Sequence, residues 1–137
     1  MSRVRLNPEQ LVFVTERHLA TLTTLRADGT PHVVPVAFTW DAERGIARVT
    51  ARRGSVKARN ARRRGADGAP PRAALCQVDG GRWLTLEGTL EAVEDPDEVA
   101  EAVRRYARRY RQVEYDPDRI VLHLHVDRTM SSAYMAS

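Results

Sequence analysis

Hydrophobic and polar residues alternate along several short runs of the chain, which is the pattern of half-buried β-strands. The clearest run is 82–93, where Leu84, Leu86 and Leu90 point to one face. A second run, 119–126, places four aliphatic side chains on one face in the same way. Runs of similar character cover residues 19–26, 31–40, 46–52 and 73–78. The pattern therefore predicts six strands.

Turn residues separate most of these runs at the spacing of β-hairpins. Asp28-Gly29 lies between the first two runs, and Asp-Gly is a strong hairpin signal. The segment 41–45 turns the chain again, and Asp79-Gly80-Gly81 ends the run at 73–78. Residues 65–71 are rich in Gly, Asp and Pro and read as a loop.

Three segments predict helices, each preceded by a capping residue. Asn7 caps a helix that reaches about residue 18, Ser55 caps one over 55–64, and Asp95 caps the longest, which reaches Val113. One stripe at helical spacing is expected to be the packing face of the longest helix, and it contains Val99, Val103, Tyr106, Tyr110 and Val113.

Six strands with few helices predict a mainly β protein with flanking helices, built on a closed or nearly closed antiparallel barrel. A doubly wound parallel sheet needs helices between most strands, and the pattern does not supply them. The length of 137 residues suits one domain, 1–137.

The composition, 42% hydrophobic and 29% charged, is that of an ordinary globular domain rather than a disordered chain. No apolar run is long enough for a membrane span, and the first ten residues lack the apolar core of a signal peptide. Cys76 is the only cysteine, so an internal disulfide is impossible. We therefore expect a cytoplasmic protein without a membrane partner.

Lys57 is the only lysine among 22 basic residues, and it lies in a segment with the character of a phosphate site. The segment 50–60 runs strand, turn, helix start; Gly54 permits close backbone approach, Ser55 offers a hydroxyl, and Lys57 and Arg53 add positive charge. The stretch from 52 to 64 holds seven basic residues and no acid, so a solvated basic helix explains the pattern as well.

Other chemistries have weaker support. The basic segment has no interleaved aromatic residues for base stacking, so we expect no nucleic-acid partner. The four histidines are scattered; His123 and His125 are two apart and can in principle chelate an ion, but we interpret them as surface residues and predict no metal site. No GxSxG, P-loop or GxGxxG motif is present, and no catalytic side chain is identified.

Residues 19–36, 54–60 and 83–88 resemble the pyridoxamine-phosphate-oxidase-like family, whose fold is a six-stranded antiparallel split β-barrel, the FMN-binding split barrel. Within that family, residues 16–20 and 105–111, together with Gln77-Val78-Asp79-Gly80, are similar to the branch that uses the deazaflavin coenzyme F420, and most of all to its biliverdin reductase subgroup. The resemblance covers nearly the whole chain.

This resemblance implies a homodimer with two cofactor sites at the subunit interface. Lys57, Ser55 and Asn60 match positions around the cofactor phosphate, and Arg53 lies beside them. Strand positions match those that line the ring. The full set of expected cofactor-binding residues is Pro35, Val36, Ala37, Phe38, Thr50, Ala51, Arg53, Ser55, Lys57, Asn60 and Gln77.

The implied activity is hydride transfer from reduced F420 to a conjugated substrate, foremost biliverdin reduced to bilirubin, with arginines binding the propionates of this tetrapyrrole. The alternatives are an FMN-dependent oxidase or reductase of the pyridoxamine-phosphate-oxidase type, and a cofactor-binding protein without turnover. The chain departs from the family in two places. Arg52 and Arg53 replace smaller residues, and the loop 65–72 is longer.

Overall fold

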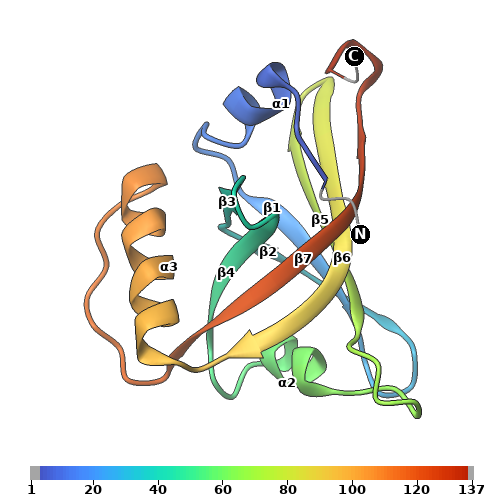
Figure 1. Ribbon diagram of the computed structural model, residues 1–137, viewed down its shortest axis with the longest axis vertical. Helices are drawn as coiled ribbons and strands as arrows, with labels where there is room; N and C mark the ends of the chain where they lie inside the picture. Colours follow the sequence, from blue (N-terminus) through green and yellow to red (C-terminus); the bar gives the residue numbers. More distant parts are fainter. Residues whose placement is uncertain (1–3, 136–137) are drawn as a thin grey trace.

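The computed structural model describes residues 4–135, in which one antiparallel sheet of seven strands is flanked by three α-helices (Figure 1). The strands are β1 (Ala20–Leu25), β2 (Pro31–Val36), β3 (Thr39–Asp41), β4 (Ile46–Arg52), β5 (Arg72–Asp79), β6 (Arg82–Val93) and β7 (Arg119–Ser131). The helices are α1 (Pro8–Phe13), α2 (Val56–Arg62) and α3 (Pro96–Arg109), followed by a 3-10 turn at Ala133–Met135. No helix in the described part of the chain is long and apolar enough to cross a membrane.

The segment 31–40 forms two strands instead of one, so the prediction of six strands is wrong. The strand order is β2-β1-β5-β6-β7-β4-β3, which puts β2 and β3 at opposite edges. Only Ala37 and Phe38 separate them in sequence. Three peptide steps span at most about 11 Å, so the sheet must curl until its two edges come close. Within residues 4–135 these edges do not pair, and the barrel is split rather than closed.

The inward faces of the strands form the core, as the alternation predicted. Leu84, Leu86 and Leu90 are each 1% exposed. Strand β7 is longer than expected and is buried on both sides over part of its length, since Val121 and His123 are buried as well as the predicted inward residues. The second face is covered because α3 lies beside β4 and β7 (Figure 1). The interpretation of His123 as a surface residue is therefore wrong.

Helices α1 and α3 end earlier than predicted, at Phe13 and Arg109. The buried residues of α3 are Ala102 and Arg109, outside the predicted Val/Tyr stripe. Part of that stripe instead lines a cavity of about 410 Å³ between α3 and the segment 113–117. The face that α3 buries differs from the predicted one because the outer face of β3, β4 and β7 carries charged residues that pair with residues of α3.

These partners are ionic. Asp41 and Arg48 form a buried ion pair of 2.8 Å on β3 and β4. Arg105 of α3 lies 3.4 Å from the same carboxylate, and Glu98 lies 3.2 Å from Arg44. Burial alone would raise the pKa of Asp41, but the hydrogen bond from Arg48 holds it below its ordinary value. Helix α3 is thus docked by charge as well as by apolar contact.

Arg109 is the innermost of these groups, with only 8% of its surface exposed. Its guanidinium donates to the carbonyl oxygens of Phe38 (2.6 Å) and Glu16 (2.9 Å) and to Oε1 of Gln77 (2.7 Å). It also lies over the rings of Phe38 and Tyr110, 4.7 and 4.9 Å from their centroids. Burial lowers the pKa of Arg109. One side chain therefore joins α3, the β2–β3 link, β5 and the chain before β1.

Replacing Arg109 by Met should lower the stability of the protein by about 3 kcal/mol, because two buried acceptors lose charge-assisted hydrogen bonds worth about 1.5 kcal/mol each. The midpoint of thermal unfolding should fall by roughly 10 °C. Arg108→Met is the matched control: Arg108 is the preceding residue of α3 and is exposed, so the change should be below about 0.5 kcal/mol. Equal unfolding midpoints for the two variants would contradict the assigned role of Arg109.

Candidate functional site

A cleft of about 330 Å³ opens where β4 passes into α2. Ser55 begins the helix, and its Oγ accepts a hydrogen bond from the backbone N–H of Ala58 (3.3 Å), as the capping pattern predicted. The residues lining the cleft are Thr50, Ala51, Arg52, Ser55, Lys57, Asp116 and Arg119. Four residues expected to bind a cofactor, Thr50, Ala51, Ser55 and Lys57, thus lie around one cleft.

Lys57 is the half-buried cation of this cleft. Among residues 4–135 its ammonium group has no hydrogen bond or ion pair, and burial lowers its pKa. Arg52 and Arg119 face each other as register partners of β4 and β7 and add two more positive charges. Asp116 is the one acid among the lining residues. An excess of cations, one of them desolvated and unpaired, is suited to an anion such as a phosphate.

Two residues expected in this cleft lie elsewhere. Arg53 turns the other way, where its guanidinium pairs with Glu94 (2.9 Å) and Asp118 (3.2 Å). The hydrogen bond to Glu94 raises its pKa further. Asn60 is 2% exposed and donates to Oγ1 of Thr24 (2.9 Å), which ties α2 to β1. Arg53 and Asn60 are therefore structural neighbours of the cleft and do not line it.

Of the residues expected to line the ring, Thr50 and Ala51 lie in the Lys57 cleft, and the others form a second group at the barrel's split edge. Pro35 is exposed, Ala37 is half-buried, and Val36 and Phe38 are buried. Gln77 is buried as well; its amide donates to the carbonyl of Phe13 (2.8 Å), and its Oε1 accepts from the guanidinium described above. These contacts fix the side chain, so Gln77 supports this edge from behind.

The register of β3 and β4 relates the positions of the two groups. Thr39 is the register partner of Arg48. Ala37 lies two residues before Thr39, and Thr50 lies two residues after Arg48, so both positions extend the same antiparallel pair in the same direction. Thr50 of the Lys57 cleft and Ala37 of the β2–β3 link therefore lie on the same side of the Thr39–Arg48 pair.

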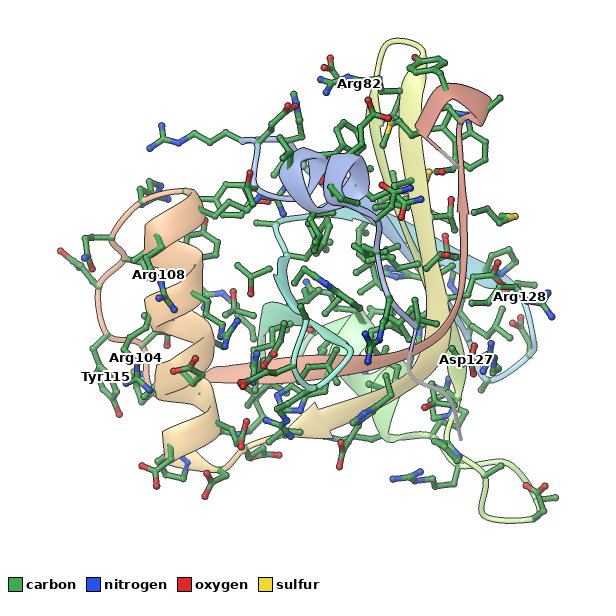
Figure 2. All side chains as sticks on the ribbon, turned by 45° about the horizontal axis from the view of Figure 1, so that its top comes forward. Arg82, Arg104, Arg108, Tyr115, Asp127 and Arg128 are labelled. Carbon is green, nitrogen blue, oxygen red and sulfur yellow. The ribbon has the colours of Figure 1, made fainter. Side chains whose placement is uncertain are left out.

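A third feature is a cavity of about 480 Å³ between α1, β3 and α3. Its walls combine apolar side chains, such as Leu11, Val14 and Trp40, with the guanidinium groups of Arg105 and Arg108. Figure 2 shows Arg108 on the surface of α3. The indole Nε1 of Trp40 is buried, and within the described residues it has no hydrogen-bond partner. This mixture is suited to a flat apolar molecule that carries an acidic group.

Sequence reasoning did not predict the residues that line the third cavity, nor Asp116 and Arg119 of the Lys57 cleft. Arg109, which also borders the third cavity, belongs to the arginine-rich segment 105–111, where nothing in composition separates a buried arginine from exposed ones. Asp116 and Arg119 follow α3 in a loop and at a strand start, and they reach the cleft only through the pairing of β7 with β4. The sequence does carry one indication for Arg109: it lies four residues after Arg105, so the two side chains share one face of the helix.

Comparison with known proteins shows what the chain is similar to in sequence and in fold. The chain is 50% identical over 129 residues to the F420H2-dependent biliverdin reductase of Mycobacterium tuberculosis (strain CDC 1551 / Oshkosh), a match that covers 94% of this chain and 90% of that protein. Its fold is similar to a conserved hypothetical protein of Mycobacterium tuberculosis, with 23% identity, a TM-score of 0.75 and coverage of 96% and 89% of the two chains. It is also similar to an F420 reductase, with 26% identity, a TM-score of 0.67 and coverage of 93% and 98%.

The family model described as pyridoxamine 5'-phosphate oxidase matches residues 6–131, which extend from the cap of α1 to the end of β7. The matched segment includes the Lys57 cleft, the β2–β3 link and the buried guanidinium that fixes it. On its sequence and on its split antiparallel barrel, the chain belongs to the pyridoxamine 5'-phosphate oxidase family.

Proposed function

We propose that this protein is an F420H2-dependent reductase that transfers a hydride to biliverdin and yields bilirubin. The observation that carries the proposal is Lys57, a half-buried cation that has no partner within residues 4–135 and lies in a positively charged cleft. The half-identical F420H2-dependent biliverdin reductase supports the choice of cofactor and substrate.

The residues of the cleft fit the phosphate of the cofactor. Lys57 supplies the missing counter-ion, and the hydroxyl of Ser55 still has its proton free to donate, because it only accepts from Ala58. Arg52 and Arg119 favour the further carboxylates of the F420 tail. When bound, reduced F420 supplies the hydride from its deazaflavin ring.

We assign the ring to the segment 35–38, next to the cleft along β4. Arg109 acts there as a positioning residue, since it holds the carbonyl of Phe38 and the side chain of Gln77 in fixed places. Arg109 also lines the cavity between α1 and α3. We assign the tetrapyrrole to that cavity, where Arg108 is placed to pair with a propionate and Trp40 to contact the conjugated system.

The outer face of the sheet supports a homodimer. One row of register partners crosses four pairs of strands, and it contains Pro35, Thr21, Cys76, Thr85 and Met130. None of these side chains is charged, and Pro35, Thr21 and Met130 are exposed. A charge-free row across a sheet face is a suitable surface for a second copy, and it includes Pro35, at the edge assigned to the ring.

Mixed with reduced F420 and biliverdin under anaerobic conditions, the protein should consume both at equal rates and form bilirubin, which absorbance spectra measure directly. Reduced FMN should not replace reduced F420, because FMN has a phosphate but lacks the carboxylates that Arg52 and Arg119 favour. Turnover with FMN and none with F420 would assign the protein to the FMN-dependent members of the family. Tight F420 binding without turnover would make it a cofactor carrier.

Lys57→Ala should weaken F420 binding about 10- to 150-fold at low salt, because a charge-assisted contact is worth about 1.5 to 3 kcal/mol. Lys57→Arg should also weaken binding, since a planar guanidinium differs in shape from a compact ammonium. The matched control is Arg59→Ala, an exposed cation of the same helix outside the cleft. Fluorescence titration gives the affinities. Arg59→Ala should bind as wild type does. If Lys57→Ala binds F420 as tightly as wild type does, the phosphate lies elsewhere.

Light scattering should give a mass of twice 15.4 kDa at micromolar concentration. Thr85→Glu, in the middle of the uncharged row, should convert the protein to a monomer, because it would bury an unpaired charge in the interface. Arg104→Glu is the control, as Figure 2 shows Arg104 on α3, away from that row. A wild-type mass of 15.4 kDa would refute the dimer.

A further inference from the structure

Three metal-ligating side chains gather on the outer face of β6 and β7, apart from the Lys57 cleft. Glu91 and His123 are register partners on these strands, and His125 follows two residues later on the same face. One ligand atom of each lies within 4.8 Å of those of the other two. His125 Nε2 and Glu91 Oε1 are 2.9 Å apart. Two imidazoles and a carboxylate are a ligand set that Zn²⁺ prefers.

The buried member of this group has an unused ligand atom. His123 is 2% exposed, and its Nε2 has no hydrogen-bond partner among the described residues. Glu98 of α3 is the nearest acid, with its Oε1 3.6 Å away. A buried imidazole nitrogen that has no hydrogen-bond partner within residues 4–135 is suited to a metal ion.

The exposed members give an ion its route from solvent. The side chains of His125 and Glu91 are 46% and 47% exposed. Their direct hydrogen bond can be replaced by an ion if the imidazole proton moves to Nδ1. Positive charge from Arg48 and Arg44 opposes a cation here, but Arg48 is paired with Asp41 and Arg44 with Glu98.

A second cluster, Glu16, His18 and Asp79, shows the contrast. Its ligand atoms are equally close, but the guanidinium of Arg82 already binds both carboxylates. Figure 2 shows Arg82 beside α1, at the end of the long β5–β6 hairpin. A cation is thus built into that cluster, whereas no arginine of residues 4–135 forms an ion pair with Glu91 of the β6–β7 group.

We propose that Glu91, His123 and His125 bind one divalent transition-metal ion per chain, of the class represented by Zn²⁺. The ion would join β6, which carries Glu91, to β7, which carries the two histidines. The site is separate from the assigned cofactor and substrate sites, so its function would be structural or regulatory.

The test is a Zn²⁺ titration of the full chain without a histidine tag and without F420, against a chromophoric chelator. One Zn²⁺ should bind per chain. His125→Ala and Glu91→Gln should each weaken Zn²⁺ binding at least tenfold. Loss of a residue that only hydrogen-bonds a metal-bound histidine already weakens metal binding by about tenfold or more, so loss of a ligand should cost at least as much. Both positions are on the surface, so these variants should fold. His18→Ala, in the second cluster, should bind Zn²⁺ as wild type does.

A second measurement follows the folded state itself. Zn²⁺ should raise the thermal unfolding midpoint of the wild type and of His18→Ala, and leave that of His125→Ala unchanged. Failure of the wild type to bind Zn²⁺, or equal affinity in wild type, His125→Ala and Glu91→Gln, would overturn the proposal. Because F420 is absent from both measurements, neither result depends on the proposed reductase activity.

Discussion

The two-residue link between β2 and β3 is the constraint on which the rest of the molecule depends. These strands lie at opposite edges of the sheet, so a connection this short forces the sheet into a barrel. The link leaves its own backbone without strand partners, and Arg109 supplies a donor to the carbonyl of Phe38 there. The same guanidinium fixes Gln77 and forms part of the cavity beside α1. Fold and candidate site thus share one buried side chain.

Charge pairing elsewhere makes Lys57 distinctive. Many arginines of this chain are paired with acids, as Arg53 is with Glu94, Arg82 with Glu16, and Arg105 with Glu101. Exposed pairs of this kind add little stability, but they neutralise local charge. The Lys57 cleft lacks such compensation, because Asp116 is its one acid among three cations. The excess of positive charge in this cleft is therefore local and does not follow from the net charge of the protein.

The sequence was a good guide to what local pattern determines. Strands β4 and β6 begin and end as predicted, and the caps at Asn7, Ser55 and Asp95 are present. Gly88 ends the segment 83–88 that resembles the family. Only glycine fits at this position, because a Cβ there would lie 1.9 Å from the carbonyl oxygen of His125. Here local pattern and close packing agree.

Errors arose where tertiary contacts decide. The split of 31–40 depends on edge closure, which no periodicity encodes. The burial of His123 and Arg109 depends on where α3 docks on the sheet. Because charged residues of the sheet pair with α3, the helix buries Ala102 and Arg109 instead of the predicted apolar stripe. Arg53 was grouped with Lys57 by adjacency in sequence, whereas the turn between β4 and α2 sends the two side chains to different sides.

The position of β7 in the sheet has a consequence for how the protein is made. Strand β7 lies between β6 and β4. Within residues 4–135 it is the only strand whose pairing connects β4 and β3 to the rest of the sheet. During synthesis, the chain up to residue 118 can form two separate sets of strands, with no hydrogen-bonded bridge between them. The barrel can therefore be completed only after β7 has left the ribosome, which makes the joining of β3 and β4 to the other strands a late step of folding.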